Sequence, residues 1–197
     1  MNRIATFIIA MSLTIMASAQ YGLNVSYQFG ISGTDLYSST MNNSMLGINA
    51  KLTYQMDDYV KFNIGTGYYN LPFKTQAYDG VLMPVSNVKA TIIPLTFGVD
   101  FSFVDAKKDA KQKFVPFVGL DLGWAWAMRS SSAYAPSATT NNFLLVPLAG
   151  VNYKLTDNLD LSASVRQNLF IYTFRGVSQY YEIFSLVGIN VGLNYKF

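Results

Sequence analysis

The sequence contains no cysteine and no histidine. Without cysteine the chain can form no disulfide bond, no thiolate ligand and no thiol nucleophile. Without histidine it lacks the general acid or base on which enzymatic membrane barrels generally depend. A Ser–Lys or Asp–Asp arrangement remains open, but no spacing in the chain singles one out. We therefore expect a protein that is not an enzyme and that holds no metal or other cofactor.

Charged residues and long apolar runs are also scarce. Only 13% of residues are charged, against roughly 25% in an ordinary soluble domain. No apolar run beyond the N-terminus approaches the ~20 residues of a membrane-spanning helix. Yet 51% of residues are hydrophobic and 15% are aromatic, a combination that favours a transmembrane β-barrel. The net charge of +3 is too small to indicate nucleic acid as a partner, and the chain has no phosphate-binding loop.

The N-terminal segment resembles an export signal. A short basic start at Arg3 precedes an apolar stretch over 4–16, and Ala17-Ser18-Ala19 forms a small-x-small cleavage site before Gln20. This pattern predicts a signal peptide over 1–19 and a mature barrel domain over 20–197. A membrane-anchoring helix is the alternative, but the apolar stretch is short for one. No cysteine follows the site, so a lipoprotein is not indicated.

Apolar and polar residues alternate along almost the whole mature chain. In the last nine residues, Ile189 to Phe197, every second residue is apolar, which is the period of a strand with one apolar face. The same pattern predicts eight strands, over 21–32, 45–55, 60–69, 91–104, 114–128, 142–155, 159–172 and 182–197. An even number of such strands predicts an all-β, antiparallel, up-and-down transmembrane barrel whose apolar face meets lipid.

The connections and the aromatic residues predict how this barrel lies in the membrane. Long and short connections alternate, and outer-membrane barrels have short periplasmic turns, so both termini are expected in the periplasm. Proline belongs at strand starts, and Pro94, Pro116 and Pro147 fall early in their strands. Outward aromatic residues form two expected rims: Tyr54, Phe62, Phe101, Phe103, Tyr153, Tyr195 and Phe197 on one side, and Phe29, Tyr68, Trp124, Trp126, Phe143, Phe170 and Tyr172 on the other. A soluble lipocalin-like barrel is disfavoured because the large apolar residues would overfill its interior.

Several stretches carry a resemblance to known families. These are the cleavage site followed by Gln20, IPLTFGVDFSF over 93–103, PFVGLDLGWAW over 116–126 and the terminal NYKF over 194–197. The chain resembles the small outer-membrane barrels of the OmpA/OmpX type, and more closely the PorT-like outer membrane protein beta-barrel domain of Bacteroidetes. The resemblance implies location in the outer membrane of a Gram-negative bacterium, with lipid and the barrel-insertion machinery as partners. It also implies that Tyr195 and Phe197 act as the insertion signal, and it implies an accessory role in protein secretion.

The inward register holds two candidate sites. One is a charge network inside the lumen: Lys51, Lys61, Asp100, Asp121, Lys154, Asp160, Arg166 and Lys196. An eight-stranded lumen is just wide enough for side chains to fill it, so the network predicts either a plug or a narrow, weakly anion-preferring pore. The other is apolar and lies near the outer end: Leu144, Val146, Leu148, Phe184 and Leu186. These residues predict either a surface on which the loops pack or a pocket for an apolar ligand.

The connections between strands offer the remaining functional candidates. The expected loops carry Tyr37, Tyr78, Tyr134, Tyr180 and Tyr181, and tyrosine is frequent at protein interfaces. We therefore expect a monomeric, non-enzymatic barrel that acts as a binding, assembly or structural module through its loops or turns. A small pore for solutes or for an apolar ligand is the alternative.

Overall fold

The computed structural model describes residues 21–32, 45–72, 75–78, 81–84, 89–104, 113–130, 137–174 and 180–197. Within these ranges, no helix is long and apolar enough to cross a membrane. The secondary structure consists of strands: β1 Tyr21–Ser32, β2 Met45–Gln55, β3 Val60–Pro72, β4 Thr75–Tyr78, β5 Val81–Pro84, β6 Lys89–Ser102, β7 Phe114–Arg129, β8 Ala138–Lys154, β9 Leu159–Phe174 and β10 Tyr180–Lys196.

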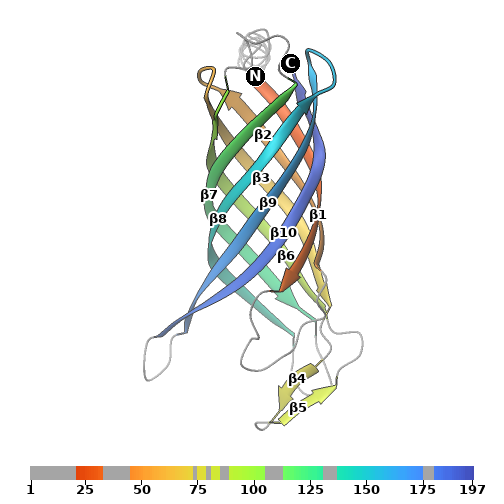
Figure 1. Ribbon diagram of the computed structural model, residues 1–197. Helices are drawn as coiled ribbons and strands as arrows, with labels where there is room; N and C mark the ends of the chain where they lie inside the picture. Colours follow the sequence, from red (N-terminus) through yellow and green to blue (C-terminus); the bar gives the residue numbers. More distant parts are fainter. Residues whose placement is uncertain are drawn as a thin grey trace, which may run out of the picture.

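Eight of these strands form a closed barrel in the order β1-β10-β9-β8-β7-β6-β3-β2 (Figure 1). Every neighbouring pair is antiparallel, and β1 closes the barrel against β10. The eight-stranded antiparallel barrel predicted from alternation is therefore confirmed. The connection expected between the strands over 60–69 and 91–104 contains an element that was not predicted, because β4 and β5 pair as a separate two-stranded sheet.

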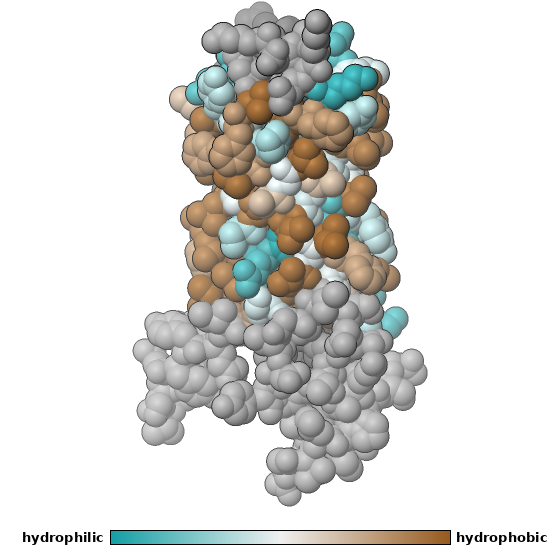
Figure 2. All heavy atoms as spheres, viewed as in Figure 1, coloured by the Kyte–Doolittle hydropathy of each residue, from teal (hydrophilic) through white to brown (hydrophobic). Residues whose placement is uncertain are grey.

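The barrel carries most of its large apolar residues on the outside. Along β10, Val187, Ile189, Val191, Leu193 and Tyr195 are exposed, while the residues between them are buried or half-buried. Figure 2 shows hydrophobic side chains over most of the barrel wall on the face that it presents. A soluble protein does not expose apolar surface on this scale, whereas a barrel in lipid must.

Aromatic residues lie at both ends of this apolar wall, with one correction to the expected rims. Phe62, Phe101, Phe103 and Tyr195 are exposed toward one end, and Phe29, Tyr68, Trp124, Trp126 and Phe143 toward the other. Phe170 was expected on the outside, but its side chain is fully buried in the lumen. It lies directly across the ladder from Phe184, which has the same inward orientation. The side chain of Tyr172 lies outside the described residues.

The two ends of the barrel differ, and we name them by what lies there. At the terminus end, the Phe197 backbone N–H donates to the Tyr21 carbonyl at 2.9 Å, so the first and last described residues meet (Figure 1). The tight turns that join β2 to β3 and β8 to β9 lie at this end as well. In the first turn, Asp57 Oδ1 accepts hydrogen bonds from the backbone N–H groups of Tyr59 and Val60, at 2.8 and 2.7 Å. The opposite end, which carries the β4–β5 sheet, is the loop end.

Two of the three prolines do not lie at strand starts. Pro116 is the third residue of β7, as expected, but Pro94 lies well inside β6 and Pro147 in the middle of β8. Proline has no N–H to donate, and each of these strands loses pairing on one side. The β3–β6 register is interrupted between Tyr69↔Ile92 and Thr66↔Leu95, and the β8–β9 register between Leu145↔Leu169 and Leu148↔Arg166. The expectation was wrong because a barrel strand can tolerate a local gap in one of its two ladders.

Candidate functional site

The lumen is the region where the structure brings polar and charged side chains together. Between the terminus end and the loop end it holds an open polar cavity, then a charged layer, then a closely packed apolar cluster. Because these side chains project inward from strands distant in sequence, the barrel closure itself assembles the site.

A single carboxylate organises the charged layer. Asp121 Oδ2 on β7 lies 2.7 Å from Lys51 Nζ on β2 and 3.4 Å from Arg166 Nη2 on β9. The side chain of Asp121 is completely buried, and that of Arg166 is 3% exposed. A buried charge is stable only when it is paired and hydrogen-bonded, and here one carboxylate serves two cations.

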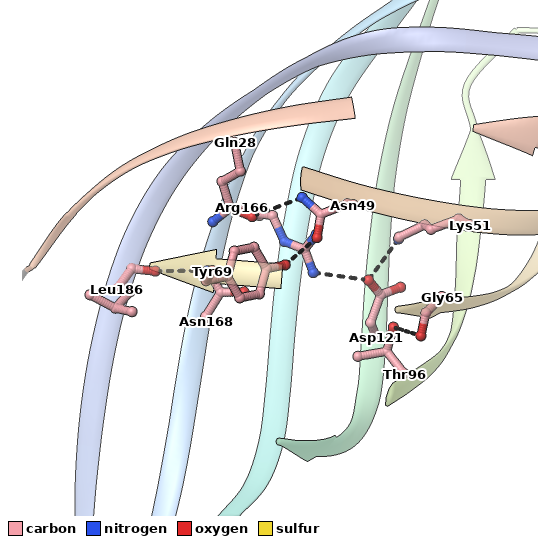
Figure 3. A network of polar contacts seen from close by, with 10 residues as sticks. All are labelled: Gln28, Asn49, Lys51, Gly65, Tyr69, Thr96, Asp121, Arg166, Asn168 and Leu186. Carbon is pink, nitrogen blue, oxygen red and sulfur yellow. Dashed lines mark hydrogen bonds and ion pairs between the residues drawn. The ribbon is translucent and has the colours of Figure 1, made fainter. Parts of the chain in front are cut away.

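A chain of uncharged groups extends this layer across the lumen (Figure 3). Asn49 Oδ1 accepts a hydrogen bond from the Tyr69 hydroxyl and lies 3.5 Å from Arg166 Nη1. Asn49 Nδ2 in turn donates to Gln28 Oε1 at 3.2 Å. The network therefore crosses the barrel from β7 and β9 to β1, β2 and β3, and it ties strands that do not pair directly.

Glycines in the wall make room for these side chains. A Cβ atom at Gly47 would overlap the ring of Tyr69, and one at Gly98 would overlap the carboxylate of Asp121. Gly47 pairs with Tyr69 across β2 and β3, and Gly98 with Asp121 across β6 and β7. Each large inward side chain thus lies over a neighbouring strand that has no side chain at that position.

The other predicted lumen charges lie nearer the terminus end. Lys196 Nζ contacts Asp160 Oδ2 at 2.7 Å, with the lysine side chain 34% exposed. Lys61 lies opposite Asp100 in the β3–β6 ladder, and Lys154 lies opposite Asp160 in the β8–β9 ladder. The eight predicted residues therefore all face the lumen, but they form a buried layer and a more open layer instead of one network.

Two cavities lie among these charges. The wider one has a volume of about 310 Å³ at the terminus end, and its lining includes Lys61, Lys154, Asp160, Asn194 and Lys196. The narrower one, of about 40 Å³, lies deeper and is lined by residues that include Lys51, Lys61, Asp100 and Arg166. The two cavities adjoin each other, because Thr53, Lys61, Asn152 and Asn194 line both of them.

Beyond the charged layer, toward the loop end, apolar side chains fill the lumen. We call this cluster the apolar plug: Met45, Tyr69, Leu71, Ala90, Ile92, Ala125, Leu144, Val146, Phe170, Phe184 and Leu186. The most tightly enclosed members are 0–2% exposed, and the rings of Phe170 and Phe184 stack with centroids 5.8 Å apart. Four of the five apolar residues named from the sequence belong to the plug. The fifth, Leu148, lines the narrower cavity beside Arg166 instead.

Sequence reasoning missed most of the plug. Phe170 was assigned to the outside, and Tyr69, Leu71, Ala90 and Ile92 were not named as lumen residues. A usable signal was present, because Phe170 and Phe184 lie opposite each other in an antiparallel ladder and must point the same way. Tyr69 likewise continues the inward register of Gly65 and Gly67 on β3.

The described residues contain no group of three or more acidic, histidine or cysteine side chains that could hold a metal ion. The predicted insertion signal lies at the terminus end, where the rings of Tyr195 and Phe197 make an edge contact with centroids 5.4 Å apart. Both side chains are exposed, and Phe197 also borders the wider cavity.

The sequence pattern of the "Outer membrane protein beta-barrel domain" family matches residues 5–197. The chain belongs to this family. It is therefore an outer-membrane β-barrel of Gram-negative bacteria, and the general resemblance noted in the sequence is confirmed, without assignment to the PorT-like group. An uncharacterised protein of Haemophilus influenzae is 27% identical over 195 residues, which cover 96% of this chain and 97% of that protein.

Solved structures of small outer-membrane barrels share the fold. OprG from Pseudomonas aeruginosa superposes with a TM-score of 0.66 at 12% identity, covering 90% of this chain and 95% of OprG. Neisserial surface protein A superposes with a TM-score of 0.61 at 15% identity, and the match covers 91% of this chain and 98% of that protein. Ail from Yersinia pestis, crystallised with the heparin analogue sucrose octasulfate, superposes with a TM-score of 0.51 at 13% identity. That match covers 90% of this chain and 97% of Ail. At these identities the likeness concerns the architecture alone.

Proposed function

We propose that this protein is a non-enzymatic barrel with a closed lumen, which acts at its two ends as a binding, assembly or structural module. The observation that carries the proposal is the apolar plug, whose side chains fill the loop-side half of the lumen. A conducting pore needs a continuous wet path, whereas Leu144, Phe170 and Phe184 have essentially no exposed surface. The polar cavity therefore opens at the terminus end and is closed on the loop side by the apolar plug.

The short turns support an orientation with both termini in the periplasm. The turns over 56–59 and 155–158 lie at the terminus end, and outer-membrane barrels place their short turns on the periplasmic side. The loop end would then face the outside, where the tyrosine-bearing connections could contact a protein partner. A role as a secretion accessory rests only on the PorT-like resemblance.

Likeness to Ail adds one possibility for the loop end. Ail has been crystallised with a heparin analogue, so a small barrel of this architecture can associate with a polyanionic saccharide. At 13% identity this is an analogy of scaffold, and function lies in the specific residues of a site. We propose the loop end of this protein as the first place to search for a partner, with protein and polyanion as separate arms of the search.

Single-channel recording in a planar bilayer tests the closed lumen. We expect no steady conductance from the folded wild-type protein. Phe170→Ala/Phe184→Ala should introduce current, because it removes the stacked rings that lie across the lumen while leaving the charged layer intact. Val187→Ala/Ile189→Ala, which truncates two lipid-facing side chains, is the matched control and should remain silent. Steady wild-type conductance that changes in Lys51→Ala/Lys61→Ala would instead establish the alternative, a small pore.

A further inference from the structure

More positive than negative side chains surround the narrower cavity. Lys51, Lys61 and Arg166 line the narrower cavity, and Asp100 is the carboxylate in its lining. Asp121 adds a second carboxylate, which contacts Lys51 and Arg166. Around the narrower cavity three cations therefore face two carboxylates, so its surroundings carry a net charge of +1.

Two cationic groups that line the narrower cavity have unused capacity to bind an anion. None of the hydrogen bonds or ion pairs formed among the described residues involves the ammonium group of Lys61. The buried Nε atom of Arg166 likewise has no hydrogen-bond partner there, and neither do Oδ1 of Asp100 and Oδ1 of Asp121, so the excess of cations decides which kind of guest fits. Leaving a charged donor buried and unpaired is costly, so this part of the lumen favours a bound anion over a dry, unneutralised cation.

From this arrangement we propose that the narrower cavity binds one monovalent anion of halide size, coordinated by Lys51, Lys61 and Arg166. Its volume of about 40 Å³ admits a small guest, since one water needs roughly 10–15 Å³ of such space. A phosphate or an organic acid would require the wider cavity. Hydroxyl donors from Ser26, Ser162 and Ser164 also lie in the lining, and a single negative charge balances the excess positive charge around the cavity.

An anion would reach this site from the terminus end and would have no exit through the barrel. The wider cavity opens at the terminus end and shares Lys61, Asn152 and Asn194 with the narrower one. On the other side, the anion would face the apolar plug. The site therefore binds an anion and stabilises the barrel, but it conducts no ions. In this it differs from the anion-preferring pore considered above.

Thermal unfolding in detergent tests the site. The purified protein is heated while chloride replaces gluconate at constant ionic strength, so that general screening is unchanged. We expect a saturable rise in Tm with chloride, because a ligand that binds only the folded state stabilises it. Lys61→Met should weaken the chloride dependence by about tenfold or more, whereas Asp100→Asn should strengthen it by removing the repelling carboxylate. Lys154→Met is the matched control, since Lys154 lines only the wider cavity.

If Lys61 and Asp100 had a purely structural role, their substitutions would not change the chloride dependence of Tm in opposite directions. Equal Tm values in chloride and gluconate for the wild-type protein would overturn the proposal, as would an unchanged chloride response in folded Lys61→Met. Should the variants fail to fold, crystals of the wild-type protein grown in bromide decide the question. An anomalous peak among Lys51, Lys61 and Arg166 supports the site, and bromide found only on the outer surface refutes it.

Discussion

Asp121 shows how much of this lumen depends on one side chain. It is the only described carboxylate in contact with both Lys51 and Arg166, and its side chain has no exposed surface. Gly98 on the neighbouring strand leaves the space that the carboxylate occupies. The Asp160–Lys196 pair has similar contact geometry, but the lysine is about one-third exposed, so water can replace a lost partner there.

Replacing Asp121 with alanine should therefore be costly. Asp121→Ala would leave two buried cations unpaired, and we expect a loss of about 3–5 kcal/mol in the free energy of unfolding. Asp160→Ala, the matched control at the terminus end, should cost about 1 kcal/mol or less, as partly exposed pairs do. Guanidinium unfolding in detergent, followed by tryptophan fluorescence, measures both. Losses of equal size would show that burial does not govern the strength of these pairs.

At the scale of one element, β10 completes the barrel. It pairs with β9 along almost its whole length and with β1 on its other edge. Its end is held on both sides, because the Lys196 N–H donates to the Asn158 carbonyl at 2.8 Å and the Phe197 N–H donates to Tyr21. These hydrogen bonds use backbone atoms and do not involve the ring of Phe197. A substitution of the ring can therefore separate a role in membrane insertion from a role in stability.

Phe197→Ala should accordingly affect assembly more than folding. We expect the variant to reach the outer membrane at a several-fold lower level in cells, while the purified chain still refolds in detergent with wild-type stability. Quantitative immunoblotting of membrane fractions and refolding yield measure the two effects. Phe103→Ala is the control, because Phe103 is an exposed aromatic at the same end, 65% exposed, but does not belong to the last strand. Equal membrane levels for the two variants would contradict an insertion signal at Phe197.

At the scale of the whole molecule, the barrel is an apolar wall around a polar, then apolar, interior. The wall sets the position in the membrane, and the difference between short turns and long connections sets the proposed direction. The absence of native cysteine makes this direction easy to test, since any introduced thiol is unique.

Single cysteines at opposite ends should label differently in intact cells. Asn158→Cys lies in the exposed turn at the terminus end, and Thr139→Cys lies at the exposed loop-side end of β8. We expect a membrane-impermeant maleimide to label Thr139→Cys in intact cells and Asn158→Cys only after the outer membrane is permeabilised. The reverse pattern would place both termini outside. Labelling of both variants in detergent confirms that each thiol is reactive.

Most of the architecture was predictable because alternation is a local property. Each strand shows which of its residues share a face, and the predicted strand bounds agree with the observed ones to within a few residues. The errors have specific causes. Phe170 was assigned to the outside although its ladder partner, Phe184, faces inward, and Pro94 and Pro147 were expected at strand starts because the tolerance of a ladder for gaps cannot be read from local pattern.

The sequence by itself determined the closed barrel, its lipid-facing wall, its aromatic ends and the set of charges that face the lumen. The tertiary structure alone decided which of those charges meet and where the lumen is filled. Lys51 and Asp121 are 70 residues apart in the chain, and Asn49 and Arg166 are 117 apart. Such contacts across a lumen depend on barrel closure and on side-chain length. The two-residue period of a strand shows only which residues share a face, so it cannot predict these contacts.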